Sequence, residues 1–400
     1  MLLAGASLSL RTLRNLENVD LGFVRENVVI IDVDPARLGY SGRRLRTFYD
    51  ELLERTRRIP GVRSAALTAM TPMGSYARSR SFSAEGYPPK AGERMVALSN
   101  PVSSGYFTAL GISMLLGREF RAEDEPTVTP GDSFFAALGR NGGGGGDKAA
   151  NASRICIINE SLARHLFGGA SPIGRRLSYD DPFDPGNAIE IVGVVKDVRH
   201  WSVRESDESG IIYVPTWSDG ADARWLVLRA GRSTAPILAA LQRELREIDR
   251  NIPVLHTTTL EEYVNANLRR ERLIAYLVGF FGALALGLAS VGLYGVMAYA
   301  VSRRTREVGI RMAVGAQRVD VIRMIISDSL VPVFAGIAVG LGATFALTRL
   351  VSAMLYGVAP HDPASMAFAT AAMLVVALVA AAIPARRASS VEPTEALRYE

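Results

Sequence analysis

Three long apolar runs in the last third of the chain constrain its fold more than any other feature. Leu273–Val301 covers 29 residues without a charged side chain or a histidine, Leu330–Thr348 covers 19, and Ala364–Ala385 covers 22. The hydrocarbon core of a bilayer is about 30 Å thick, and a helix that rises about 1.5 Å per residue crosses it with roughly 20 apolar residues. We therefore expect three membrane-spanning helices, at about residues 273–301, 326–349 and 364–385.

The distribution of arginine predicts the orientation of these helices. The segment 302–324 contains six arginines against two acidic residues, and the tail after the last run adds Arg386, Arg387 and Arg398. The linker 349–363 has one arginine and no lysine. Because loops rich in Lys and Arg stay in the cytoplasm, the 302–324 loop and the C-terminus are predicted to be cytoplasmic. Three spans then place the large N-terminal part of the chain outside.

Composition narrows the class of protein. The net charge is +5, and much of it lies in the 302–324 loop, where it accounts for topology and contact with the lipid bilayer. No basic stripe with interleaved aromatic residues occurs, so nucleic-acid binding is not expected. Cys156 is the single cysteine, which excludes an intrachain disulfide. Its neighbours Ile155, Ile157 and Ile158 predict a buried position in a strand.

The first residues, 1–23, do not have the order of a signal peptide. Met1–Leu10 is apolar but too short to span a membrane, and the basic residues Arg11 and Arg14 follow it instead of preceding it. We interpret this segment as the end of a truncated membrane helix and its connector. The chain is then expected to be a fragment, or the second half, of a longer membrane protein.

Residues 24–258 predict an α+β domain. Gly42–Ile59 and Thr234–Ile248 carry apolar residues at i, i+3, i+4 and i+7, the spacing of a helix that packs on a sheet. The predicted strands are Asn27–Val33, Val62–Met70, Met95–Ser99, Ile155–Asn159, Ile189–Val198, Ile211–Pro215, Trp225–Ala230 and Pro253–Thr258. A second short helix is expected at Glu160–Phe167. The fold class is thus an α+β extracytoplasmic domain followed by a three-helix transmembrane block at 259–400.

The segment 126–153 is predicted to be a flexible insertion in this domain. It contains five consecutive glycines, Gly142–Gly146, among Asn, Ala and Ser, and it has too little apolar surface to order itself. A phosphate-binding loop is excluded because Asp147 separates the glycines from Lys148, and Ala149 replaces the Ser or Thr of that motif.

The junction between the domain and the first span is predicted to be helical throughout. Thr259 and Glu262 have the spacing of a capping box, and no helix breaker follows before the apolar run. One helix is expected from Thr259 to about Val301, long enough to join the outer domain rigidly to the membrane.

Signs of catalysis are scarce. The histidines, His165, His200, His256 and His361, are widely spaced, and the sequence has no HExxH, CxxC or GxSxG motif. We expect a non-catalytic protein that binds no metal or cofactor.

The loop after the first span carries the most specific motif. Residues 303–316 read RRTREVGIRMAVGA, and the tail contains PARRA at 384–388 and EPTEALR at 392–398. Both resemble the FtsX-like permeases. Upstream, GYFTALGI at 105–112, GREF at 117–120, INE at 158–160, PIGRR at 172–176 and IVGVVKDV at 191–198 resemble the MacB-like periplasmic core domain. The order of these motifs over the whole chain is most similar to the C-terminal half of acidobacterial duplicated orphan permeases.

This resemblance implies a multi-pass protein of the bacterial inner membrane, with a periplasmic N-terminal domain and a cytoplasmic C-terminus. It also implies that the loop docks on an ABC ATPase. The residues that carry over are Arg304, Arg306, Glu307, Gly309, Arg311, Ala313, Gly315 and Ala316. Small residues allow a close approach, and the charged ones can form charge-assisted contacts. The alternative is that the arginines only set topology. No Walker motif occurs, so ATP is expected to act through a partner ATPase.

Small residues also recur within the spans. Gly279, Ala283 and Gly287 lie four residues apart in the first span, and Gly336 and Gly340 do so in the second. Such rows let helices approach closely. They predict either packing within the block or contact with a homodimer partner or second permease half.

Two functions follow from the resemblance. One is the permease of a MacB-type ABC transporter, in which a partner ATPase drives movement of the periplasmic domain for efflux or export, with a periplasmic adaptor or outer-membrane channel as a further partner. The alternative is an FtsX-like signalling scaffold that controls a periplasmic cell-wall hydrolase. Copurification of an adaptor or channel, as opposed to a hydrolase, would separate them.

Overall fold

A computed structural model describes residues 2–74, 78–125, 154–204, 210–217, 224–231, 233–303, 310, 317–351 and 363–389. The chain divides into two compact units: one consists of Asp20–Asn267, and the other of Met1–Val19 with Leu268–Glu400. The predicted insertion at 126–153 lies outside the described residues.

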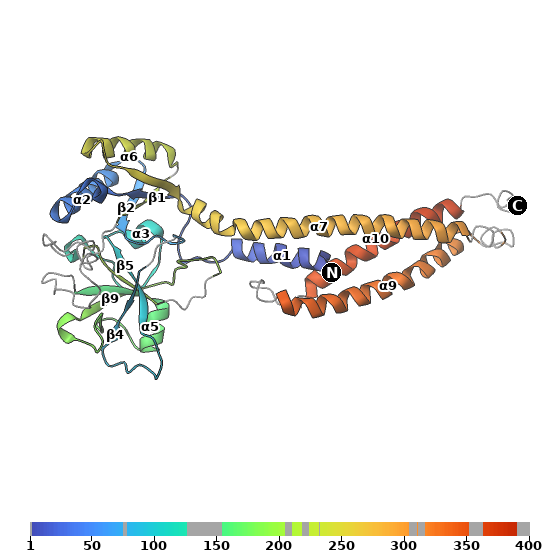
Figure 1. The fold of residues 1–400 in the computed structure, drawn as a ribbon, viewed down its shortest axis with the longest axis horizontal. Coiled ribbons are helices and arrows are strands. Elements are labelled where there is room, and N and C mark those ends of the chain that lie inside the picture. The colour runs from blue at the N-terminus through green and yellow to red at the C-terminus, as the bar shows by residue number, and fades with distance from the viewer. Residues whose placement is uncertain are drawn as a thin grey trace. The chain divides into compact units, whose positions relative to one another are not determined.

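The first unit is built on a sheet whose described strands number twelve (Figure 1). The strands are β1 (Val28–Val33), β2 (Val62–Thr68), β3 (Ser79–Ser81), β4 (Ser83–Ala84), β5 (Val96–Val102), β6 (Met114–Gly117), β7 (Ile155–Asn159), β8 (Arg176–Ser178), β9 (Ile189–Val195), β10 (Ile211–Pro215), β11 (Trp225–Ala230) and β12 (Val254–Thr259). They run in the order β12-β1-β11-β2-β5-β10-β7-β9-β8-β4, with β3 on β5 and β6 on β9. The pairs β5–β10 and β7–β9 are parallel, so the sheet is mixed.

One half of this sheet carries helices α2 (Gly42–Arg58) and α6 (Ala235–Ile248) on the same face (Figure 1). Both helices bury the apolar stripe that the sequence predicts. In α2 these side chains are Leu45, Phe48, Tyr49, Leu52 and Leu53, and in α6 they are Ile237, Leu241 and Leu245. The Tyr49 hydroxyl also donates a hydrogen bond of 2.7 Å to the carbonyl of Val33. The predicted arrangement of helices on a sheet is therefore confirmed here.

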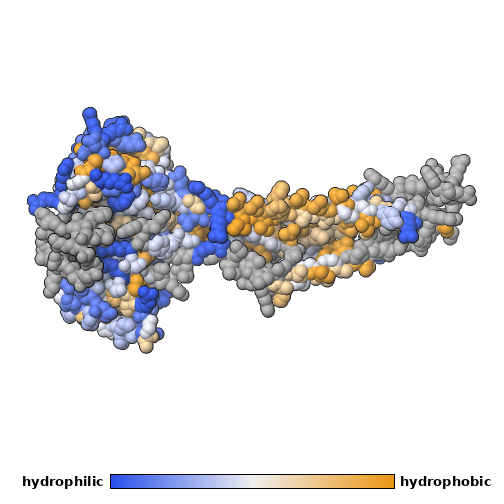
Figure 2. All heavy atoms as spheres, in the orientation of Figure 1, coloured by the Kyte–Doolittle hydropathy of each residue, from blue (hydrophilic) through white to orange (hydrophobic). Residues whose placement is uncertain are grey.

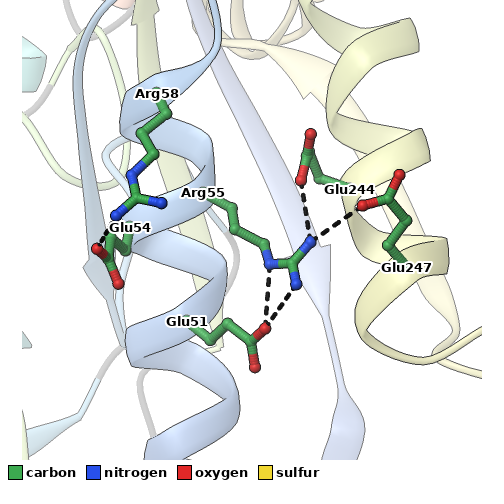
Figure 3. Close-up of polar contacts among 6 residues, drawn as sticks. All are labelled: Glu51, Glu54, Arg55, Arg58, Glu244 and Glu247. Atoms are coloured by element: carbon green, nitrogen blue, oxygen red, sulfur yellow. Dashed lines mark hydrogen bonds and ion pairs between the residues drawn. The ribbon is translucent and has the colours of Figure 1, made fainter.

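An ion-pair network joins the outer surfaces of α2 and α6. The guanidinium of Arg55 on α2 lies 2.9 Å from Glu51 on the same helix, and 3.2 Å from both Glu244 and Glu247 on α6 (Figure 3). Arg58, one turn further along α2, pairs with Glu54 of its own helix.

The other half of the sheet has its own core beneath α5 (Glu160–Phe167). Between the halves, β2 and β5 pair only at Thr68 and Val102. Buried Asn100 bridges this narrow point, because its side chain accepts a hydrogen bond from the amide of Met70 at 3.1 Å and donates one to the carbonyl of Met70 at 3.0 Å. Cys156 is fully buried on β7, as its apolar neighbours predict.

The second unit contains α1 (Leu2–Glu17), α9 (Arg318–Val351), α10 (Pro363–Ser389) and most of α7 (Leu260–Arg303). Among the described residues, α7 and the Pro363–Pro384 part of α10 are long and apolar enough to cross a membrane. In α9 the described apolar stretch is shorter, Val333–Ala346. All three expected spans are thus helical, and crossing by α9 stays a prediction. Figure 2 shows the apolar surface along these helices.

Candidate functional site

The predicted ATPase-coupling residues all lie outside the described residues. These are Arg304, Arg306, Glu307, Gly309, Arg311, Ala313, Gly315 and Ala316. The structure does describe the helices on either side of them: α7 ends at Arg303 and α9 begins at Arg318. Ile310, which is described, is helical and 48% exposed. The loop therefore connects two long helices and presents at least one large apolar side chain at its surface.

The other end of α7 is fixed by the predicted capping box. The amide of Glu262 donates to the Thr259 hydroxyl at 3.1 Å, and the amide of Thr259 donates to the Glu262 carboxylate at 2.9 Å. The Thr258 hydroxyl donates a second hydrogen bond to the same carboxylate, at 2.7 Å. These hydrogen bonds hold the pKa of Glu262 below its ordinary value. Because β12 ends at Thr259, strand and helix follow each other without an intervening loop.

Helix α7 itself is continuous over 44 residues. At about 1.5 Å per residue it is roughly 66 Å long. The sequence prediction of one helix from the capping box to the end of the first apolar run is thereby confirmed.

The predicted small-residue rows face away from the other described parts of the chain. A Cβ atom built at Gly279, Gly287, Gly336 or Gly340 meets no described atom of another element within 4 Å. Ala283, between the first two, is exposed. The described part of the chain therefore leaves these faces uncovered, and contact with a second permease copy stays a prediction.

Different small residues bring the helices together within the block. A Cβ atom built at Gly282 on α7 would lie 3.4 Å from the Cβ of Ala6 on α1. Ser7 of α1 donates a hydrogen bond to Ser365 of α10 at 3.1 Å. Sequence reasoning missed these contacts, although Ala275 and Gly282, seven residues apart on one helix face, were an available signal.

Two of the predicted motifs of the periplasmic domain place glycines where neighbouring strands come into close backbone contact. Gly117 has a φ of +74°, and a Cβ there would lie 2.1 Å from the carbonyl oxygen of Val192. A Cβ on Gly193 would lie 2.6 Å from the carbonyl oxygen of Arg118. The glycines in the GREF and IVGVVKDV motifs therefore let β6 and β9 touch backbone to backbone, which explains why the motifs occur together.

A carboxylate in the second of these motifs positions helix α5. Asp197, just beyond β9, accepts hydrogen bonds from the amide and the hydroxyl of Ser161, at 2.9 and 2.6 Å. It also accepts one from the Asn159 side chain at 2.7 Å. Asn159 in turn accepts from the amide of Ile211 at 2.9 Å. These hydrogen bonds join β7, α5 and β10 to the residues that follow β9.

The titratable groups of the described residues do not form a metal site. No cluster of three or more His, Cys, Asp or Glu that could hold a metal occurs among the described residues. Burial raises the pKa of the Cys156 thiol and lowers the pKa of His200 to about 4, so both are neutral at physiological pH. His165 pairs with Glu93, and His256 stacks on Tyr263. His361 lies outside the described residues.

A mixed sheet domain that continues directly into long apolar helices is the architecture of a membrane permease with a large extracytoplasmic domain. The family model of the MacB-like periplasmic core domain matches residues 13–247, and that of the FtsX-like permease C-terminal region matches residues 279–393. The chain belongs to the MacB-like, FtsX-like family of ABC transporter permeases. Membership implies an inner-membrane protein with a periplasmic domain.

Several curated proteins are similar over much of the chain. An uncharacterized ABC transporter permease, YknZ of Bacillus subtilis, is 24% identical over 77% of this chain and 71% of its own length. The macrolide export ATP-binding/permease protein MacB of Bdellovibrio bacteriovorus is 23% identical over 62% of this chain. The pyoverdine export ATP-binding/permease protein PvdT of Pseudomonas putida is 28% identical over 64%. The chain spans 39% of the length of MacB and of PvdT.

Solved structures of extracytoplasmic domains are also similar. The periplasmic region of MacB from Actinobacillus actinomycetemcomitans matches 64% of this chain and 97% of that structure, with 11% identity and a TM-score of 0.37. The extracellular domain of YknZ from Gram-positive bacteria matches 58% of this chain and 99% of that structure, with 16% identity and a TM-score of 0.34. The family assignment rests on the sequence models.

Proposed function

We propose that this chain is the permease component of a MacB-type ABC transporter, in which a separate ATPase drives movement of the periplasmic domain for efflux or export. Export is supported by relatives named for macrolide and pyoverdine export. In the proposed topology all three helices cross the inner membrane, the 302–324 loop faces the cytoplasm, and the small-residue rows contact a second permease copy.

The observation that carries this proposal is the uninterrupted helix α7. Its first residue follows β12 directly, its first turn is fixed by the capping box, and its last residue, Arg303, begins the predicted docking loop. A continuous helix transmits a displacement along its axis, whereas a flexible linker would absorb it. When an ATPase dimer closes, the resulting displacement of the loop would therefore be transmitted by α7 to β12, the strand at the edge of the periplasmic sheet.

The chemistry of the loop suits docking on a protein surface. Gly309, Ala313, Gly315 and Ala316 permit close approach. Glu307 and its neighbouring arginines can form charge-assisted hydrogen bonds. In this proposal ATP is bound and hydrolysed by the partner. The chain contributes the docking surface and helix α7, which connects that surface to the periplasmic domain.

The test is to change the loop and measure the bound ATPase. The double variant Glu307→Lys, Gly309→Trp reverses a charge and fills a small-residue position. It should lower the amount of ATPase that copurifies with the full chain by about tenfold, which corresponds to about 1.4 kcal/mol. The matched control is Asp362→Lys, Gly357→Trp in the 349–363 linker, which is predicted to be outside and should retain the ATPase. Normal retention and stimulation in the loop variant would refute the docking assignment.

A further inference from the structure

The charged surface at the outer end of the helical unit has no role in the proposed function. Five arginines, which we call the arginine collar, lie there: Arg11, Arg14, Arg269, Arg270 and Arg272. Glu17 and Glu271 are the acidic residues in the same two stretches, 11–17 and 269–272. Five positive charges against two negative ones leave a net charge of +3. Figure 2 shows a hydrophilic band where the apolar surface of the helices ends.

The collar residues from α1 and α7 lie at neighbouring levels because the two helices run antiparallel. Ala6 faces Gly282, and the Glu17 carboxylate accepts a hydrogen bond from Arg272 at 3.0 Å. These partners are eleven residues apart on α1 and ten apart on α7, so the helices stay in register. Arg14 is then level with about residue 275 of α7. It lies about 8 Å along the axis from the level of Arg269 and Arg270.

Three collar residues are available to a ligand. Arg14, Arg269 and Arg270 are exposed and make no ion pair with the described residues. Arg272 is held by Glu17 and packs within the collar instead. The structure thus presents unneutralised guanidinium groups over a depth similar to that of the headgroup layer of a bilayer.

The surface next to these arginines is apolar, which identifies the chemistry of the ligand. Leu273 is 59% exposed and Tyr276 is 65% exposed, within one or two turns of Arg270. A tyrosine at this level is typical of the membrane interface. A ligand that covers both surfaces needs an anionic head and an apolar tail. A soluble anion would leave the apolar part uncovered, and an acidic protein would need to enter the membrane.

We infer that the arginine collar binds anionic phospholipids, with their phosphodiester groups on Arg14, Arg269 and Arg270 and their acyl chains along the start of the apolar run of α7. Guanidinium groups recognise phosphate through paired hydrogen bonds and keep their charge at any physiological pH. The inference requires the helices to lie in a bilayer. It does not require docking of an ATPase, so the two proposals fail independently.

The test uses the purified full chain in nanodiscs of phosphatidylcholine with a minor fraction of phosphatidylglycerol. Spin-labelled analogues of the two lipids report the fraction of each that is immobilised by the protein. The parent chain should favour phosphatidylglycerol by about threefold. The variant Arg14→Gln, Arg269→Gln, Arg270→Gln should lose about half of this preference or more. The Arg→Lys version keeps the charge but loses the paired hydrogen bonds, so its preference should lie between those of the parent and the Gln variant.

A matched control removes three exposed arginines from the first unit. Arg43→Gln, Arg243→Gln, Arg246→Gln changes the net charge by the same amount at positions on α2 and α6 that make no ion pair with the described residues. It should leave the lipid preference unchanged. If the collar variant keeps the full preference, anionic lipids are bound elsewhere, for example by the arginines of the 302–324 loop, and the inference is wrong. Absence of any preference in the parent chain would also overturn it.

Discussion

Two regions of the molecule bury side chains of opposite size. The half-sheet under α2 and α6 buries large apolar side chains, whereas the helical block with α7 and α10 exposes them and buries small ones. In the first region Phe48 and Leu52 are buried, at 3% and 0% exposure. In the second, Phe280 and Leu288 are 64% and 67% exposed, whereas Ala381 is 2% exposed. Both regions are rich in apolar residues, so composition alone does not explain the difference.

The difference follows from the solvent that each region meets. Water drives large apolar side chains into a core, because burial of apolar surface is the main favourable term in folding. Lipid chains are as apolar as leucine, so they provide no such force, and helices associate through close packing of small residues instead. The domain should therefore be sensitive to backbone clashes and buried charge, and the block to enlargement of its few close contacts.

The largest effect is expected at the β6–β9 joint. Gly117→Val introduces a Cβ that would lie 2.1 Å from the Val192 carbonyl oxygen, at a φ of +74°. Gly86→Val is the control, since Gly86 has a φ of +73° and no atom near the added Cβ. Gly117→Val should lower the free energy of unfolding by about 3 kcal/mol more than the control. Tryptophan fluorescence during urea unfolding measures this, because all three tryptophans lie within residues 201–225.

Equal loss of stability in the two glycine variants would show that backbone conformation alone matters at Gly117. The close contact between β6 and β9 would then not explain why the two motifs occur together.

A smaller effect is expected from the buried imidazole of His200. Burial lowers its pKa from 6.5 to about 4, so the unfolded chain binds more protons between these values. Its contribution to stability is complete above pH 6.5 and is lost as the pH falls toward 4. At pH 5 the loss should be about 2 kcal/mol relative to pH 7.

Urea unfolding at pH 7 and pH 5 checks this expectation. His200→Gln should reduce the pH dependence by about that amount. A parent chain and a His200→Gln variant with the same pH dependence would exclude His200 as its source.

In the helical block the expected effect is on helix contact. Gly282→Leu should push α1 away from α7, because the added side chain would meet Ala6 of α1. Gly287→Leu is the control on the same helix, as its Cβ meets open space. The readout is oxidative cross-linking of cysteines introduced at Gly5 on α1 and Val278 on α7, since a Cβ atom at Gly5 would lie 3.9 Å from the Val278 side chain. The cross-link yield should fall severalfold with Gly282→Leu and stay high with Gly287→Leu.

The same contrast in solvent explains which features the sequence predicts. Periodicity located α2, α5, α6 and most strands, because each buries a regular stripe, and the capping box placed the start of α7. Sequence reasoning did not find β6 or the parallel pairing of β7 with β9, since these depend on distant residues and on glycine contacts such as Gly117 with Val192. In the block the spacing of small residues drew attention to Gly279 and not to Gly282. Many small residues recur there, and only packing decides which of them face another helix.

The smallest effect is expected from the ion pairs on the surface of α2, where water competes with every contact. Arg55→Ala removes the contacts with Glu51, Glu244 and Glu247, while Arg58→Ala removes a pair within one helix (Figure 3). Exposed ion pairs contribute little to stability, but Arg55 also links two helices. Its loss should lower the urea midpoint slightly more than the loss of Arg58, and added salt should shrink the difference. If Arg55→Ala instead destabilised the domain as strongly as Gly117→Val, surface electrostatics would hold α6 in place, and apolar burial would not dominate in this region.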